Sequence, residues 1–340
     1  MNAGGESFPS ETLSVGIAGK DAPVALVINN FTRVSAPVSF ASKDSLFAGF
    51  QDKMDAGVPY IQDINYIGSQ YEFRRWIPWM DDDSCGFGSS NSDYETKVIA
   101  GNTFDFPYVH GKALMANGYS FVSASRSAVE NGKVHMRRYA MVDVICGKQI
   151  TTQVGRKGAC PLKYEVFTPQ LQKQLTEYAN VGGNIFISGA NIGSDAWEPV
   201  FDYEVTDQMK KDVVEPTQKF IKEVLHYQWM TNQATNVGTF YETQNPLGFG
   251  YHAKTSADRP RGYVWNPKPN TKKYAVESPD GIIPAGDNAY TIFRYNNSIS
   301  AGVAYEGSYK VVSLGVPFEV LSLEMQQTML MKDIIKFFEK

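Results

Sequence analysis

A glycine-flanked turn, Gly189–Gly193, is the part of this sequence closest to a catalytic motif. It follows a short apolar segment, Asn184–Ser188, and reads Gly-Ala-Asn-Ile-Gly. A strand, a sharp Gly-x-nucleophile-x-Gly turn and a helix are how many hydrolytic enzymes hold a nucleophile above the carboxyl edge of a sheet. Here the central residue is Asn191, whose amide is neither nucleophilic nor ionisable. The pattern predicts the frame of a catalytic turn without its usual chemistry.

A second candidate is the aromatic and charged stretch Tyr71–Gly86, which carries two tryptophans, two arginines and four acids. Aromatic rings can stack on sugars, and arginine side chains donate paired hydrogen bonds. We expect a ligand to meet the residues Arg74, Arg75, Trp76 and Trp79. The alternative is a structured surface loop whose arginines and aspartates pair with each other, an arrangement that contributes about 0–1 kcal/mol per exposed pair.

The acids of the same stretch raise a catalytic alternative. Two carboxyl groups at a defined separation can serve as the acid and base of a glycosidase. The candidates are Glu72, Asp81, Asp82 and Asp83. The segment also matches the first half of a calcium loop, but Cys85 and Ser92 stand where ligands are required. We expect no metal and no cofactor.

Further candidates come from the carboxyl ends of the expected strands, where an open parallel sheet binds its ligands. These positions are Asn30, Arg33, Asn191, Asp195 and Glu319. To them we add His110, with Asn102 and Asp105 close to it in the sequence. The alternative is structural, because such polar residues often cap helices and close loops.

The hydrophobic pattern predicts the elements that position these residues. Short apolar runs indicate strands, and the expected strands are Val24–Asn29, Ser120–Ala124, Tyr139–Cys146, Asn184–Ser188 and Tyr309–Val316. Helices are expected at Leu46–Met54, Tyr108–Asn117, Gln170–Ala179 and Glu324–Phe338. A period of two begins near Thr231. We predict an α/β fold with a doubly wound, mostly parallel sheet and an antiparallel, hairpin-rich extension inserted at about 231–310.

Composition narrows the classes of partner. The chain has 340 residues, 43% of them hydrophobic, and a net charge of −4. This balance lacks the clustered basic face of a nucleic-acid-binding protein, and no apolar run is long enough to span a membrane. The three cysteines form no C-x-x-C pair, which argues against structural zinc. Cys146 is expected to be a buried thiol.

The first residues resemble the last strand of a fibronectin type III domain. Residues 2–15 contain the Asn-x-x-Gly-x-Ser and Ser-x-Pro-Ser elements followed by alternating apolar residues. We therefore expect residues 1–19 to be a domain remnant and linker and residues 20–340 to be the main domain. If the remnant packs on that domain, Phe8, Leu13 and Val15 should face it.

Two resemblances to known families cover the main domain. The order of elements and the glycine turn resemble the class I glutamine-amidotransferase-like fold, although Asn191 replaces the nucleophile and no histidine accompanies Glu319. Four longer motifs are Gly57-Val-Pro-Tyr-Ile-Gln-Asp, Pro78-Trp-Met-Asp-Asp-Asp, Ala100-Gly-Asn-Thr-Phe-Asp-Phe-Pro and Ala275-Val-Glu-Ser-Pro-Asp-Gly. They are similar to the C-terminal region of secreted bacterial proteins labelled xanthan lyase or N-acetylmuramoyl-L-alanine amidase, which also carry golvesin-type and fibronectin domains.

The second resemblance implies a secreted, cell-surface or periplasmic protein whose partners are glycan or cell-wall fragments and its own upstream domains. The expected function is a non-catalytic or degenerate-enzyme module that binds glycan or acts as a scaffold. The alternative is a hydrolase or lyase that uses the carboxylates of Tyr71–Gly86 on cell-wall or acidic polysaccharide.

Overall fold

The computed structural model describes backbone and side chains for residues 13–31, 106–151, 165–198, 208, 211–253, 258–265, 267, 276 and 279–340. Backbone alone is described for residues 38–41, 47–51, 71–74, 152–153, 162–163 and 210.

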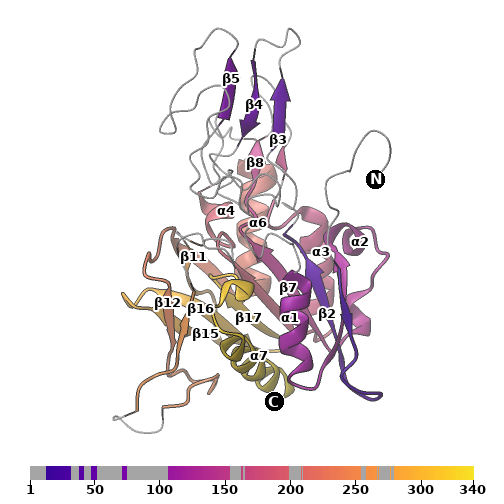
Figure 1. The fold of residues 1–340 in the computed structure, drawn as a ribbon, viewed down its shortest axis with the longest axis vertical. Coiled ribbons are helices and arrows are strands. Elements are labelled where there is room, and N and C mark those ends of the chain that lie inside the picture. Colours follow the sequence, from indigo (N-terminus) through magenta and orange to yellow (C-terminus); the bar gives the residue numbers. More distant parts are fainter. Residues whose placement is uncertain are drawn as a thin grey trace.

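A ten-stranded sheet forms the centre of the molecule (Figure 1). In spatial order its strands are β1 (Val15–Gly16), β6 (Ser120–Ser125), β2 (Val24–Asn29), β7 (Met141–Gly147), β10 (Ile185–Gly189), β17 (Lys310–Leu314), β16 (Ser300–Glu306), β15 (Ala289–Tyr295), β12 (Thr239–Glu242) and β13 (Gly262–Val264). The neighbours β6, β2, β7, β10 and β17 are parallel. The remaining pairings of this sheet are antiparallel.

The predicted fold class, a doubly wound and mostly parallel α/β sheet, is therefore wrong. The sheet is mixed, and its antiparallel pairings outnumber the parallel ones. The period of two after Thr231 correctly indicates strands, but it does not say where they pair. Most of these strands extend the same sheet beyond β17. Strand β17 pairs in parallel with β10 on one side and antiparallel with β16 on the other. A strand with an unpaired edge can pair with another chain and aggregate, and the pairing with β16 covers that edge of β17.

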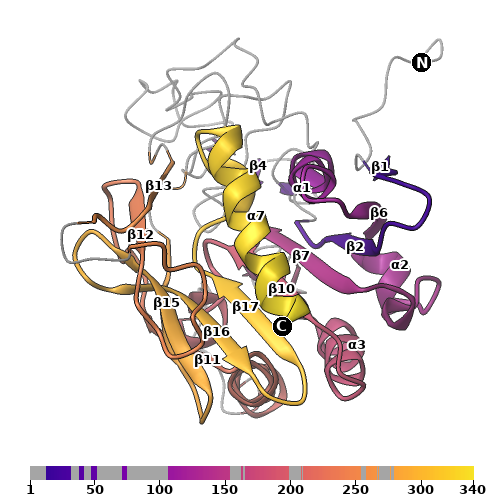
Figure 2. The ribbon, with the colours of Figure 1, turned by 90° about the horizontal axis from the view of Figure 1, so that it is seen from below.

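Helices cover both faces of the sheet (Figure 2). They are α1 (Phe106–Met115), α2 (Arg126–Glu130), α3 (Pro169–Ala179), α4 (Ser194–Trp197), α6 (Glu215–Phe220) and α7 (Glu324–Glu339), with 3-10 turns η1 (Met136–Arg138) and η4 (Phe318–Val320) and π-helical turns η2 (Lys210–Val214) and η3 (Ile221–Leu225). One face lies under α1 and α7, which are side by side, and the other under α2 and α3.

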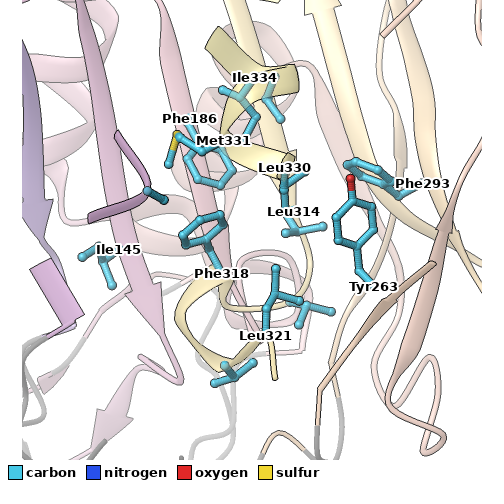
Figure 3. Packing of buried hydrophobic residues seen from close by; sticks show 14 of the residues in the cluster. Ile145, Phe186, Tyr263, Phe293, Leu314, Phe318, Leu321, Leu330, Met331 and Ile334 are labelled. Carbon is cyan, nitrogen blue, oxygen red and sulfur yellow. The ribbon is translucent and has the colours of Figure 1, made fainter. Parts of the chain in front are cut away.

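Each face has its own apolar core because successive residues of a strand point to opposite sides. Phe186 of β10 packs under α7 beside Phe318 and Met331 (Figure 3). Its neighbours Ile185 and Ile187 point to the other face, where α3 contributes Leu171 and Leu175. The central parallel strands are thus buried on both sides, as their continuous apolar sequences require.

Local signals set the start of α3. The Thr168 hydroxyl accepts the Leu171 N–H at 3.2 Å, and Pro169 takes the first helical position. A threonine N-cap followed by proline suits the unpaired N–H groups of a first turn. The predicted helix Gln170–Ala179 is confirmed.

The expected helix Leu46–Met54 is wrong. Residues Phe47–Gln51 form strand β4, which pairs with β3 (Val38–Ala41) and β5 (Tyr71–Arg74) in a separate sheet. A short apolar run does not distinguish a strand from a helix by periodicity alone. Two further pairs complete the strands that the structure describes: β8 (Thr152–Gln153) with β9 (Leu162–Lys163), and β11 (Tyr227–Thr231) with β14 (Gly281–Pro284).

The N-terminal segment joins the sheet, but not through the residues expected to face the body. Ser14 N donates to Ser123 Oγ at 2.6 Å, and β1 pairs antiparallel with β6. Leu13 and Val15 are 46% and 68% exposed, so the prediction that they pack on the body is wrong. Phe8 lies outside the described residues. The register of β1 turns Ser14 and Gly16 inward instead, because adjacent strand residues alternate.

Gly111 in α1 lets that helix lie directly on β6. A Cβ there would stand 2.0 Å from the Phe121 ring. We predict that Gly111→Ala lowers the free energy of unfolding by about 1–3 kcal/mol through overpacking, although alanine in a helix interior usually adds about 0.5–1 kcal/mol. Urea denaturation measures this, with Gly19→Ala as control because a Cβ at Gly19 meets nothing within 4 Å. A Gly111→Ala protein as stable as wild type would contradict the prediction.

Candidate functional site

The glycine turn, Gly189–Gly193, lies at the carboxyl end of β10 and leads into α4. Its N–H groups already have an anionic partner. The backbone N–H groups of Gly193 and Ser194 both donate to Asp280 Oδ2 at 2.7 Å. Asp280 comes from the segment before β14, and its own N–H donates to the Ala190 carbonyl at 2.9 Å. Exposed N–H groups at the start of a helix are the usual anion-binding feature of such a turn. A side chain of the protein occupies them here.

Asn191 lacks the geometry of a presented nucleophile. A nucleophile elbow is strained at its central residue. In the part of the chain that the structure describes, the non-glycine residues with positive φ are His226, Gln233, Asn288 and Ser298, so Asn191 is not one of them. The Asn191 amide donates to the Gln149 carbonyl at 3.4 Å. Its role is that of a turn residue held to the neighbouring loop.

Both glycines of the turn have packing reasons to be glycine. A Cβ at Gly189 would stand 2.6 Å from the Cβ of Cys146, and one at Gly193 would stand 3.0 Å from the Cβ of Trp229. The Tyr227 hydroxyl also donates to the Ile192 carbonyl at 2.7 Å. The turn is thus enclosed by β11 and by the Asp280 segment.

Burial changes the protonation of Asp280. The side chain is fully buried, and burial raises its pKa to about 7, with the two N–H donors opposing that rise in part. Its second oxygen, Oδ1, has no hydrogen-bond partner among the described residues. A carboxyl in a dry environment favours its neutral form unless it is well paired.

A second polar cluster, which we call the buried triad, consists of His110, Asp143 and Glu319. His110 Nδ1 lies 2.7 Å from Asp143 Oδ2, and His110 Nε2 lies 3.2 Å from Glu319 Oε2. The three side chains are 0%, 0% and 2% exposed. They join α1, β7 and η4 at the face covered by α1 and α7. An imidazole held by two carboxylates resembles a catalytic relay, but no solvent reaches this one.

The triad is held together by charge. Burial alone lowers the pKa of His110, but Asp143 and Glu319 outweigh that effect and raise it to about 9. Burial has the opposite effect on a carboxyl group and raises the pKa of Asp143. His110 is therefore an imidazolium at neutral pH, as expected for a histidine between carboxylates. Such a group holds a proton without being poised to transfer it.

The remaining edge residues fasten a loop. Asp195 accepts the Thr151 N–H at 2.5 Å and the Val166 N–H at 3.1 Å. Asn30 Nδ2 donates to the Val166 carbonyl at 2.8 Å. Arg126 Nη1 donates to the Glu165 carbonyl at 2.7 Å. These bonds to backbone groups favour the structural alternative for Asn30 and Asp195.

The structure thus describes five of the predicted ligand residues and joins two of them. His110 and Glu319 meet in the buried triad, whereas Asn30, Asn191 and Asp195 bind backbone groups nearby. Glu72 and Arg74 lie on β5, where backbone alone is described. The other candidates lie outside the described residues: Arg33, Arg75, Trp76, Trp79, Asp81, Asp82, Asp83, Asn102 and Asp105.

Two buried acids, Asp143 and Asp280, are not among the residues predicted from the sequence. Asp143 interrupts the apolar run Met-Val-Asp-Val-Ile of β7. A charged residue inside a strand buried on both faces is rare unless it is paired, so it signals a buried polar partner. Asp280 sits in Ser-Pro-Asp-Gly, which is typical of an ordinary turn. Nothing local marks its pairing with Gly193, 87 positions away.

Other site classes find little support in the described part of the chain. No group of three or more His, Cys, Asp or Glu side chains is arranged there to hold a metal ion. Cys146 is a free, buried thiol, and burial raises its pKa to about 12. Such a thiol is not a reactive nucleophile. None of the described helices has the length and apolar character needed to cross a bilayer.

No family model and no curated protein matches this chain. Two cytoplasmic proteins from Salmonella typhimurium have a similar structure at 12% identity. STM3548 has a TM-score of 0.44 over 92% of this chain and 98% of its own, and STM1381, from strain LT2, has 0.40 over 93% and 100%.

The exo-β-1,4-mannosidase Op5Man5 from Opitutaceae bacterium strain TAV5 is similar over 68% of this chain and 29% of its own, at 10% identity and a TM-score of 0.33. Likenesses this weak carry no argument about function. The resemblance to secreted cell-envelope proteins stays a prediction.

Asp280 can be tested with two substitutions. We predict that Asp280→Ala lowers the free energy of unfolding by about 1–3 kcal/mol, because two buried N–H groups lose their acceptor. Asp280→Asn keeps one acceptor oxygen and should cost less. Urea denaturation at pH 5 and pH 8 measures both, with the exposed Asp287→Asn as control.

The Asp280 series also has a pH signature. The folded pKa, about 7, lies above the ordinary value of 3.8, so between these values the folded chain binds more protons than the unfolded chain. This contribution to stability is therefore fully present below pH 3.8 and is lost as pH rises toward 7. Asp280→Asn should remove that slope. Equal destabilisation by the Ala and Asn variants at both pH values would contradict this account.

The buried triad predicts a separate pH window. We expect His110→Gln to lower the free energy of unfolding at pH 7 by about 3–5 kcal/mol, because it leaves buried carboxylates without a cation. Since the folded pKa of about 9 exceeds the ordinary 6.5, the stabilisation is complete below pH 6.5 and is lost as pH rises through 9. Denaturation between pH 6 and 10 tests this against the exposed His135→Gln. Identical pH profiles for both variants would refute it.

Proposed function

We propose that this chain is a non-catalytic module of a cell-envelope protein, with a role in binding glycan or in scaffolding. The observation that carries the non-catalytic part is the Asp280 carboxylate on the N–H groups of Gly193 and Ser194. In an enzyme of the elbow type, the residue after the nucleophile, here Ile192, donates its N–H to the charge that develops on the substrate. A carboxylate on the next two N–H groups, at 2.7 Å from each, lies beside that position and disfavours a second negative charge there.

The residues that the structure describes at this edge do not meet the other requirements of nucleophilic catalysis. A nucleophile needs a base within hydrogen-bond reach and access to substrate. Asn191 supplies no nucleophile, and the nearby thiol of Cys146 is buried with a raised pKa. The basic ring of His110 is completely buried and held by two carboxylates. Its partners are structural, so the triad supports a fixed scaffold instead of a reaction.

The glycan part of the proposal rests on the sequence. Trp76 and Trp79 with Arg74 and Arg75 are the residue types that stack on sugars and donate paired hydrogen bonds. The motifs that resemble the C-terminal region of secreted proteins labelled xanthan lyase or N-acetylmuramoyl-L-alanine amidase supply the context. A hydrolase or lyase that uses the carboxylates of Tyr71–Gly86 is the alternative outcome of the same experiments.

Turnover separates the two functions. We predict that wild type, Asp82→Asn and Asn191→Cys all release no reducing ends from peptidoglycan or acidic polysaccharide. Asn191→Cys should stay inert because Asp280 still occupies the turn. Turnover by wild type that Asp82→Asn abolishes would replace this proposal with the carboxylate enzyme.

Binding is measured with the same chain. Isothermal titration with peptidoglycan fragments and acidic polysaccharides should show binding that the double variant Trp76→Ala/Trp79→Ala weakens at least tenfold. The control is Trp229→Phe, because Trp229 lies beside the glycine turn and is not one of the proposed ligand residues. Absence of binding to every glycan would leave only the scaffold role.

A further inference from the structure

A cavity of about 300 Å³ opens between α1 and the start of α7. Its polar lining comes from Tyr108 and Lys112 on α1 and from Ser322, Glu324, Gln327 and Thr328 at the other wall. This volume lies at the lower end of the range of ligand sites, about 300–1,000 Å³. It suits one small ring-shaped molecule, not an extended chain.

Gln327 is built as a fixed hydrogen-bonding group in this cavity. Its residue is 5% exposed, and its Nε2 donates to the carbonyls of Glu319 and Leu321 at 3.3 Å each. These two bonds orient the amide. The Oε1 atom takes no hydrogen bond from any residue that the structure describes, so it is an acceptor available to a ligand.

The opposite wall offers an aromatic ring. Tyr108 is 51% exposed although it lies on a helix packed against the core. A tyrosine ring combines an apolar face with a polar hydroxyl, which suits the C–H face and hydroxyl rim of a sugar. Ring, oriented amide and small hydroxyl side chains are therefore gathered around one space.

The charges of the lining favour an uncharged ligand. Lys112 is the one cation among the described residues that line the cavity, and its Nζ lies 2.8 Å from Glu324 Oε2. Glu324 also opens α7, where its negative charge complements the positive end of the helix dipole. An anion would have to displace this carboxylate. A neutral polyol can hydrogen-bond to the same pair without separating it.

We propose that this cavity binds a single neutral sugar ring, stacked on Tyr108 and donating a hydroxyl to Gln327 Oε1. The choice of ligand rests on the proposed role in binding glycan. None of the described residues that line the cavity belongs to the stretch Tyr71–Gly86.

Saturation-transfer NMR and isothermal titration with N-acetylglucosamine and glucose test the proposal on the full chain. We expect millimolar binding that Tyr108→Ala weakens at least tenfold and Tyr108→Phe largely retains. Gln327→Met, which keeps the shape but lacks the acceptor, should weaken it as well. The matched control is Tyr241→Ala, because Tyr241 is 40% exposed on β12 outside the cavity. Circular dichroism confirms that each variant is folded.

Three outcomes would overturn the inference. They are no binding of either sugar, equal binding by wild type and Tyr108→Ala, or tighter binding of glucuronate or sulfate than of glucose. If polymer binding persists and depends on Trp76 and Trp79 while these sugars do not bind, the cavity inference fails and the proposed function stands. If neither sugars nor polymers bind, both the cavity inference and the glycan role fail.

Discussion

One buried carboxylate joins the two halves of the sheet. Asp280 accepts the N–H groups of Gly193 and Ser194, while its own carbonyl accepts the Tyr295 hydroxyl at 2.7 Å. The first contacts belong to the turn after the parallel strand β10, and the last belongs to the antiparallel strand β15. Burying a carboxylate is costly unless fixed donors replace its water. The donors here are backbone groups of a helix start, so the turn and the strand extension must form together.

The buried triad is a second polar cluster of the interior, at the face covered by α1 and α7. A cation between two carboxylates in a dry interior is weak support for net stability, but removing one partner leaves an uncompensated charge. Such a cluster therefore selects one arrangement of α1, β7 and η4 over looser packings of the same apolar residues. In these two buried clusters, the polar side chains that the structure describes are bound to other groups of the protein.

The sequence pattern predicts individual helices and strands, but it does not predict which distant segments pair with them. Thr168 and Pro169 mark α3, and apolar runs mark the five parallel neighbours, because these signals act within a few residues. The mixed character of the sheet was missed because a period of two does not encode which edge a hairpin joins. Asp143 was detectable as a charge in an apolar strand. The Asp280 contact spans 87 positions and leaves no local trace.

The buried triad also fixes the walls of the surface cavity. On α1, His110 points inward to Asp143, whereas Tyr108 is exposed. Tyr108 lies two residues earlier and therefore on the opposite side of the helix. On the other wall, Gln327 donates to the carbonyl of Glu319, whose carboxylate holds His110. The Tyr108 ring and the Gln327 amide are thus both connected to the buried triad and not to separate loops. A binding site needs this kind of support, because groups set by packed partners lose little entropy when a ligand arrives. The histidine that resembles a catalytic residue is better explained as the support of a binding surface.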